Sequence, residues 1–230
     1  MPADKLLVCA PCYNARQSQN VNALIAAATS QHGWPALSID AVSVSLLAFA
    51  FNIGLAKALN MRAEYSHWLL WHDDIVPQGT TWLRTMRDEM ASTGAHVLSV
   101  PVAIKDGSGD VSMALSTEDP YAPRRMRLKE IQALPETWVC NGSPLGEVMI
   151  NTGLMLVDLR WEPLERCRFT IQDTIRKDPD GQWRAGVIPE DWDFSRQVYR
   201  EGGTIAVTRK VKVAHLGRAE YNSWDTWGPE

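Results

Sequence analysis

The sequence lacks the features that mark membrane, secreted and nucleic-acid-binding proteins. No apolar run approaches the roughly 18–20 residues that span a bilayer, and the first residues, MPADKLLVCAPCYNAR, have no signal-peptide core. The formal net charge of −4 gives no overall basic surface for nucleic acid. Internal repeats and low-complexity tracts are also absent. These absences favour a soluble globular protein, for which we expect a cytoplasmic location.

Cysteine is scarce, with four residues in the chain. Cys9 and Cys12 form C-A-P-C, a spacing that also occurs in thioredoxin-like redox pairs. A zinc site would need a second pair, and Cys140 and Cys167 lie too far apart in the sequence to supply one. We favour reduced thiols that pack in the interior, with the redox and metal interpretations as alternatives.

The first hundred residues alternate between predicted strands and helices. This order is typical of a mostly parallel sheet with helices on both faces, in which ligands bind beyond the carboxyl ends of the strands. Two polar segments occupy such ends, 11–14 and 72–74. The pattern predicts strands over 5–10, 36–42, 67–71 and 95–102, and helices over 17–29, 47–59 and from 80 or 81 to 94.

The second half is less regular. Lys105–Asp110 (KDGSGD) is a turn signal, and residues 116–146 lack periodicity, which predicts a long loop with one short helix. Further strands are expected over 148–151, 153–159, 204–208 and 211–215, with a helix over 190–201. We predict one domain over 1–217, made of two halves (1–104 and 105–217) and followed by a tail (218–230).

Asp73 and Asp74 come directly after the most apolar predicted strand, His67–Trp71. Adjacent carboxylates at an exposed strand end suit a divalent cation, and such a cation can neutralise a leaving diphosphate. The alternative is that the two residues only end the strand and cap the next segment of the chain.

The surrounding sequence resembles GT-A glycosyltransferases, especially the inverting family 2. That family has an Asn-containing helix start, an apolar strand, D-x-D and an apolar-apolar-Pro stretch. Matching residues occur here in the same order: Asn52, the strand 67–71, His72-Asp73-Asp74 and Ile75-Val76-Pro77. The opening LLVCAPCYNAR resembles the strand and P-x-Y-N segment that cradle the nucleotide. By this resemblance the donor is bound by Pro11, Cys12, Tyr13, Asn14, Asn52, His72 and Asp73.

The triplet departs from the family at its first position, where His72 replaces Asp. The resemblance implies that Asp74 contacts the metal, Mn²⁺ or Mg²⁺, most directly. An imidazole can contact the ribose or a metal-bound water as the first Asp does. The alternative is a degraded site that binds the donor without turnover.

A second match lies in PEDWDFSRQVYREGG and VAHLG. Glu190 and Asp191 correspond to the family's acidic pair, whose Asp is the general base in inverting members. His215 corresponds to the His of His-x-Gly, which returns to the metal. The simpler interpretations are acidic residues that complement a helix dipole and a histidine at a strand end.

Three further features concern the acceptor. The segment Asn151-Thr152-Gly153 matches a family segment that borders the acceptor pocket, although a tight turn explains its glycine equally well. Trp192, and Trp224 and Trp227 of the tail, are candidates to stack on a sugar or base, and the tail could close as a lid. A basic run could meet an anionic acceptor or the donor phosphates, or be a solvated face: Arg124, Arg125, Arg127 and Lys129.

Together the motifs predict a metal-dependent glycosyltransferase with a GT-A type fold and a UDP- or GDP-sugar donor, and the family 2 resemblance implies inversion. The acceptor stays open among a glycan, a small molecule, a protein and a hydroxylated DNA base. A sugar nucleotidyltransferase is one alternative, although the first loop, PCYNARQSQN, lacks the glycines that grip a triphosphate. A non-catalytic nucleotide-sugar-binding module is the other.

Overall fold

The computed structural model describes residues 5–11, 34, 36–42, 44–143, 145–217 and 220–224. Its centre is a seven-stranded sheet in the order β2-β1-β3-β10-β5-β13-β8. Strands from both halves of the chain therefore share one sheet. The strands are β1 (Lys5–Pro11), β2 (Ala36–Val42), β3 (His67–Trp71), β5 (Val97–Ser99), β8 (Thr137–Val139), β10 (Leu154–Asp158) and β13 (Ile205–Thr208).

Most of these strands run in one direction. β1 is parallel to both β2 and β3, and β5 is parallel to β13. β10 is antiparallel to β3 and β5, and β8 is antiparallel to β13. The predicted α/β class, with a mixed and mostly parallel sheet flanked by helices, is confirmed.

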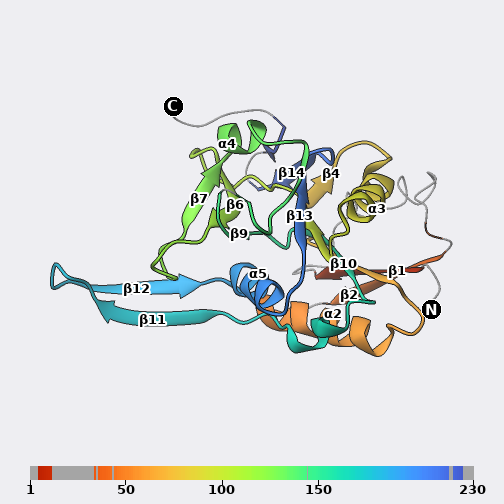
Figure 1. Ribbon diagram of the computed structural model, residues 1–230, viewed down its shortest axis with the longest axis horizontal. Coiled ribbons are helices and arrows are strands. Elements are labelled where there is room, and N and C mark those ends of the chain that lie inside the picture. Colours follow the sequence, from red (N-terminus) through yellow and green to blue (C-terminus); the bar gives the residue numbers. More distant parts are fainter. Residues whose placement is uncertain are drawn as a thin grey trace.

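Helices cover both faces of the sheet (Figure 1). Leu7 and Cys9 of β1 pack in the cluster that includes α2 (Leu47–Asn60), whereas Leu6 and Val8 pack in the cluster that includes α3 (Trp82–Thr93). This alternation results from the two-residue period of a strand. α5 (Glu190–Arg200) joins the α2 side through Phe194, whose ring stacks on Phe169 at 4.4 Å.

Two smaller sheets extend the central one. The first, in the order β15-β14-β4, joins β4 (Ile75–Pro77) to β14 (Val213–Leu216) and β15 (Glu220–Asn222). It brings the C-terminal part of the chain beside the segment after β3. The second consists of β7 (Arg124–Arg127), β6 (Asp110–Leu115) and β9 (Val148–Met149), with α4 (Leu128–Gln132) next in the chain after β7.

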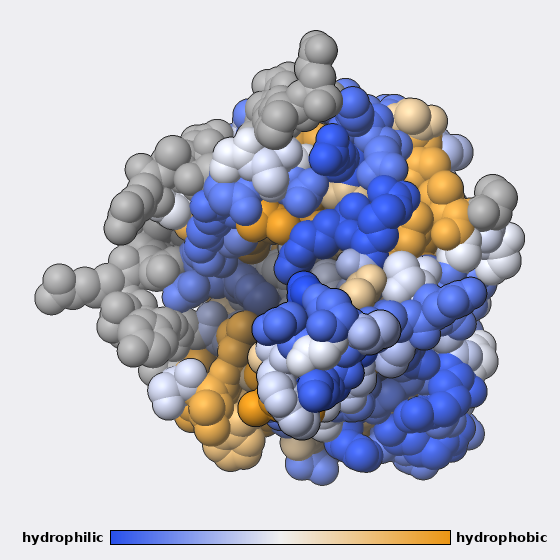
Figure 2. Space-filling view, turned by 90° about the vertical axis from the view of Figure 1, so that its left-hand side faces the viewer, coloured by the Kyte–Doolittle hydropathy of each residue, from blue (hydrophilic) through white to orange (hydrophobic). Residues whose placement is uncertain are grey.

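A long hairpin projects from the body of the molecule (Figure 1). Its strands are β11 (Gln172–Lys177) and β12 (Trp183–Ile188), which among the described strands pair only with each other. It comes after a 3₁₀ helix, η1 (Glu162–Arg166), and leads directly into α5. Seen from the side on which the hairpin projects, the surface is mainly hydrophilic, with apolar residues in separate patches (Figure 2).

The structure differs from the sequence-based picture in two places. Residues 116–146 contain the expected short helix, α4, but also β7 and β8, so the expected long loop was wrong. The hairpin was not anticipated at all. The helix expected over 17–29 lies outside the described residues. Across the described part of the chain, no helix is long and apolar enough to cross a membrane.

Candidate functional site

A tight turn after β3 presents the His72-Asp73-Asp74 triplet. The His72 amide donates to the Gly153 carbonyl at 2.9 Å, and the Ile75 amide donates to the His72 carbonyl at 3.2 Å. The Trp71 indole nitrogen also donates to the Ile75 carbonyl, at 2.7 Å. Backbone hydrogen bonds on both sides therefore fix the direction in which the two aspartates leave the sheet.

Asp74 contacts two side chains from distant parts of the chain. The Lys105 ammonium donates to Asp74 Oδ2, and His215 Nε2 lies 3.4 Å from the same oxygen. The backbone holds this arrangement, because the Leu216 amide donates to the Asp74 carbonyl at 2.8 Å and His215 pairs with Ile75 between β14 and β4. The structure thus brings together the two residues predicted as metal ligands.

His215 is oriented as a metal-binding histidine would be. Its Nδ1 lies 2.7 Å from the Ala103 carbonyl oxygen, which can only accept, so Nδ1 carries the proton. Nε2 then faces the Asp74 carboxylate. Two ligands at about 2.1 Å from one ion lie roughly 3.0–3.4 Å apart, and the observed separation is 3.4 Å. The pair fits a divalent cation whose other ligands are phosphate oxygens and water.

The described residues alone supply no full set of metal ligands here. Among the described residues, no group of three or more His, Cys, Asp or Glu side chains is arranged to hold a metal ion. Mg²⁺ commonly uses one or two carboxylates together with substrate phosphates. A cation at Asp74 and His215 would therefore need further ligands, such as phosphate oxygens of a ligand or water.

Asp74 and His72 differ in charge, and the surroundings of each side chain explain why. Burial alone would raise the pKa of Asp74, but hydrogen bonds from His215 and Lys105 outweigh it and hold this pKa well below its usual range. Burial lowers the pKa of His72 to about 4, although the nearby Asp74 opposes that shift. At neutral pH, Asp74 is ionised and His72 is an uncharged imidazole.

His72 is placed by its neighbours. Its ring lies 4.9 Å from the Phe51 ring, and Nε2 lies 3.3 Å from the Thr152 hydroxyl oxygen. Thr152 belongs to the predicted acceptor segment, so the structure joins this segment directly to the triplet. A neutral imidazole here can form a hydrogen bond with Thr152 or with a ligand hydroxyl.

Asp191 and Glu190 open α5 in a largely enclosed position. Burial, together with a smaller contribution of repulsion from Glu190, raises the pKa of Asp191 to about 8. Burial also raises the pKa of Glu190. A carboxyl group whose pKa lies near neutral pH can accept a proton from a hydroxyl group more readily than an ordinary surface carboxylate.

α5 is fastened to the acceptor segment through Ser195. The Ser195 hydroxyl donates to the Asp191 carbonyl at 2.8 Å and accepts from the Ile150 amide at 3.0 Å. Ile150 directly precedes Asn151 and Thr152. The acidic pair and the triplet are therefore linked through the segment 150–153.

Several predicted binding residues are engaged within the protein. Asn151 donates to the Val100 carbonyl at 2.7 Å and accepts from the Gly153 amide at 3.0 Å, so its amide holds the turn in shape. A side chain at Gly153 would lie 3.1 Å from Asn151 Oδ1. Trp192 is buried, with the Arg125 guanidinium 4.9 Å from its ring centre. Their contacts with an acceptor stay predictions.

The predicted donor-binding residues are only partly within the described structure. Pro11 ends β1, whereas Cys12, Tyr13 and Asn14 lie outside the described residues, as do Trp227 and most of the tail. The Asn52 amide makes two hydrogen bonds with the Phe169 backbone, at 2.7 and 2.9 Å. Asn52 thereby fixes the chain ahead of the hairpin, and its contact with a donor stays a prediction.

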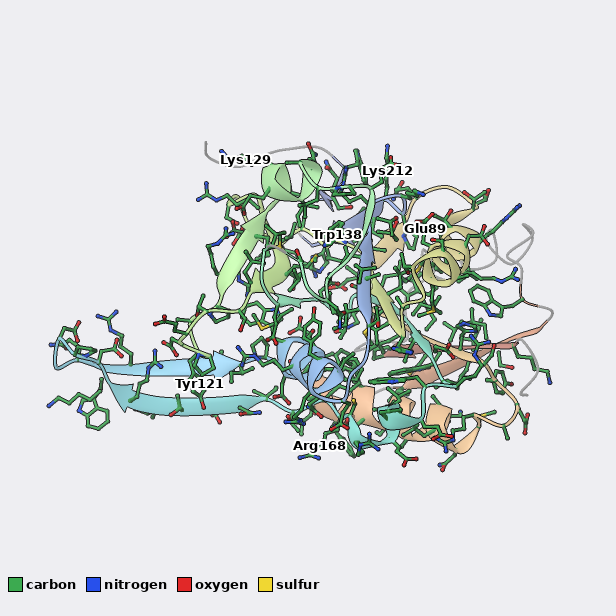
Figure 3. All side chains as sticks on the ribbon, in the orientation of Figure 1. Glu89, Tyr121, Lys129, Trp138, Arg168 and Lys212 are labelled. Atoms are coloured by element: carbon green, nitrogen blue, oxygen red, sulfur yellow. The ribbon has the colours of Figure 1, made fainter. Side chains whose placement is uncertain are left out.

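The basic run is divided among different neighbours. Arg124 forms an ion pair with Glu130 at 2.8 Å, and Arg127 lies 3.8 Å from Asp110. Lys129 lies on α4 at the edge of the molecule (Figure 3). Only Arg125 lies over a residue of the candidate site, Trp192. Within this part of the chain the run does not form one continuous cationic face.

Lys105 is the member of the site that the sequence did not reveal. It stood out only as the first residue of a turn signal. The isolated bridge between Ala103 and Val111, together with the hydrogen bond from the Ile104 amide to the Asp110 carbonyl at 3.0 Å, folds this turn back. Short-range spacing carries no signal for a contact made 31 residues along the chain.

Comparison with family models and with curated protein sequences gave no match. Among solved structures, A197 from STIV aligns with a TM-score of 0.55 and 12% identity, over 98% of this chain and 97% of that one. At that identity the likeness establishes a shared fold alone.

Two further solved structures align at lower TM-scores. The catalytic domain of Drosophila beta1,4galactosyltransferase 7, in complex with xylobiose, aligns at 0.48 with 13% identity, over 98% of this chain and 70% of that one. S. aureus TarS 1–349 aligns at 0.45 with 11% identity, over 89% and 58%.

Proposed function

We propose that the chain is a glycosyltransferase that moves a sugar from a nucleotide-sugar to an acceptor hydroxyl group. One observation carries the proposal, the convergence of Asp74 and His215 at 3.4 Å at the end of a mixed α/β sheet. A carboxylate and an imidazole at such an edge suit a cation that faces a diphosphate.

The donor side of the reaction rests on three charged or polar groups. Asp74 and His215 would hold Mn²⁺ or Mg²⁺, which supplies positive charge to the leaving diphosphate. Lys105 places an ammonium group beside Asp74 and so adds positive charge at the same place. His72 and Asp73 support donor binding, together with the segment 11–14, for which we propose a UDP- or GDP-sugar.

The acceptor side rests on the acidic pair. Asp191 takes the proton from the acceptor hydroxyl group, and its raised pKa matches that task. Glu190 adds to the rise of that pKa by repulsion. The segment Asn151–Gly153 and Trp192 flank the acceptor. Direct attack by the activated oxygen on the sugar carbon inverts its configuration.

A panel of nucleotide-sugars tests the proposal. Each donor is incubated with the protein and Mn²⁺ or Mg²⁺, and the released nucleoside diphosphate is measured with and without EDTA. We expect hydrolysis or transfer from one donor, lost on chelation. Absence of both binding and turnover across the panel would refute the proposal.

A second candidate is a nucleotide-sugar-binding module without catalysis. The ion pair between Lys105 and Asp74 favours it, because an ammonium group then neutralises the carboxylate without a metal. Calorimetry distinguishes the two. The module binds a donor with the same affinity in EDTA and releases no diphosphate with any acceptor.

A further inference from the structure

The hairpin β11–β12 has two unlike faces. One face lies against Tyr121, which Figure 3 shows beside the hairpin. A Cβ added at Gly186 of this face would lie 2.9 Å from Tyr121 Cβ. Arg176, on the same face, donates to Asp119 at 2.7 Å and lies over the Tyr121 ring. These contacts fasten this face to the loop between β6 and β7.

The other face is apolar and open to solvent. Strand alternation and the pairing of Ile175 with Ala185 place both residues on this face, with Trp183 and Val187 on either side along β12. The exposed fractions are 74% for Ile175, 69% for Trp183, 48% for Val187 and 54% for Ile171, just before β11. Two-stranded hairpins are marginally stable alone in water, so an exposed apolar face of this size calls for a partner.

We propose that this partner is a second copy of the chain, bound face to face and antiparallel, with the two-fold axis passing beside Ile175 and Ala185. The register makes the face complementary to itself. Lys177 pairs with Trp183 near the tip, and Asp173 pairs with Val187 near the base. Reversal of the strand direction sets Trp183 over Val187 of the second copy and Asp173 over Lys177 of the second copy.

The charges on this face fit the same arrangement. Asp173 and Lys177 are exposed and lie two residues on either side of Ile175. The ion pairs found among the described residues involve Arg176 and Arg184 of the hairpin but neither of these two. Opposite charges therefore meet twice across the two-fold axis, and no like charges do.

The apolar area fits a weak, reversible dimer. With side chains that offer roughly 150–250 Å² each, the four exposed residues present roughly 400–500 Å² per copy. Two copies would bury about 800–1,000 Å², which is in the range of weak or transient protein interfaces.

Sedimentation velocity over a concentration series tests the dimer. We expect the wild-type protein to sediment at twice the 25.7 kDa chain mass. Ile175→Glu sets two like charges together at the two-fold axis and should raise the dissociation constant roughly 100-fold. The matched control is Phe49→Glu, which changes an equally large exposed apolar residue on α2, 55% exposed, and should leave the dimer intact.

A charge exchange tests the antiparallel register. Asp173→Lys and Lys177→Asp should each weaken the dimer, and the double variant should restore it. A wild-type monomer at about 100 µM would overturn the proposal, as would a dimer indifferent to Ile175→Glu. A monomer that sediments with anionic vesicles would overturn it in favour of a membrane surface. Circular dichroism confirms that each variant is folded.

Discussion

At the scale of single residues, two contacts from distant parts of the chain meet at one carboxylate oxygen. Asp74 Oδ2 contacts both the Lys105 ammonium and His215 Nε2, which come from separate parts of the chain. A cation bound at this site would depend on this oxygen more than on Asp73 beside it.

Asp74→Asn should reduce donor turnover by at least roughly 100-fold, because it removes the negative charge that the cation and Lys105 share. Steady-state kinetics with the active donor measures the loss. Asp88→Asn is the matched control, since Asp88 is exposed and makes a helical-surface pair with Arg84 at 3.6 Å. Equal activity of both variants would remove Asp74 from the mechanism.

We expect ionisation of Asp191 to raise activity and to lower stability. Its pKa of about 8 in the folded protein exceeds the ordinary value of 3.8. Between these values the unfolded chain releases a proton that the folded chain keeps, so stability falls as pH rises from about 4 to 8. Asp191→Asn lacks this loss and should therefore gain in Tm over the wild type towards pH 8, while turnover disappears.

Thermal unfolding and kinetics over a pH series measure both effects. Glu190→Gln is the informative partner variant, because it removes the repulsion that contributes to the raised Asp191 pKa. It should move the acidic limb of the activity profile to lower pH. A Tm difference between Asp191→Asn and wild type that does not change with pH would contradict the assigned burial.

At the residue scale, the order of the family motifs supplied long-range information. It placed Asp74 and His215 in one site, and the structure brings them within 3.4 Å; their role as metal ligands stays a prediction. Lys105 was missed because a lone lysine in a turn has no period or motif. Asn52 matches the family motif, and in the structure its amide is hydrogen-bonded to the Phe169 backbone. Local sequence does not encode this contact, because the two residues are 117 positions apart.

At the scale of elements, α2 sits close enough to β1 to need a glycine. A side chain at Gly54 would lie 2.5 Å from Cys9 Sγ and 3.4 Å from the Trp68 ring. Gly54→Ala should therefore destabilise the protein by about 1–3 kcal/mol despite the better helix propensity of alanine. Chemical denaturation measures the change in free energy of unfolding.

The control variants for this prediction come from the same distances. Gly107→Ala meets nothing within 4 Å and should be close to neutral. Combining Gly54→Ala with Cys9→Ala removes the clashing sulfur and should recover much of the loss. If Gly54→Ala alone is neutral, then α2 and β1 are farther apart than described.

Elements with a strong period were predicted well, and elements without one were not. β2, β3 and α2 match their predicted ranges to within a residue, because α2 follows the helical period and the strands are short runs rich in apolar residues. The hairpin β11–β12 was missed because charged residues alternate with few apolar ones. Its turn, Asp178-Pro179-Asp180-Gly181, was the one available signal.

At the scale of the whole molecule, we expect ligand binding to stabilise the fold by holding the two halves of the chain together. Asp74 directly precedes β4 and His215 lies on β14, so the site joins the first half of the chain to the second. A ligand that binds only the folded state at about 100 times its Kd adds about 2.7 kcal/mol of stability. We expect the active nucleotide-sugar with Mn²⁺ to raise Tm by several degrees, and EDTA to abolish the increase.

Differential scanning calorimetry measures this shift, and Asp74→Asn supplies the control because it retains the nucleotide segment but loses the cation site. An equal shift for the variant and the wild type would place the nucleotide away from Asp74. A shift that persists in EDTA would support the non-catalytic module with Lys105 as its fixed cation.

The pairing of β14 with β4 also determines when the candidate site is completed during synthesis of the chain. During synthesis the triplet leaves the ribosome long before His215, and β4 has no β14 beside it until residues 213–216 appear. A nascent chain can build much of the central sheet first, yet the candidate site stays incomplete until residues 213–216 have been made. Chains that stop before residue 213 would thus lack the His215 side of the site.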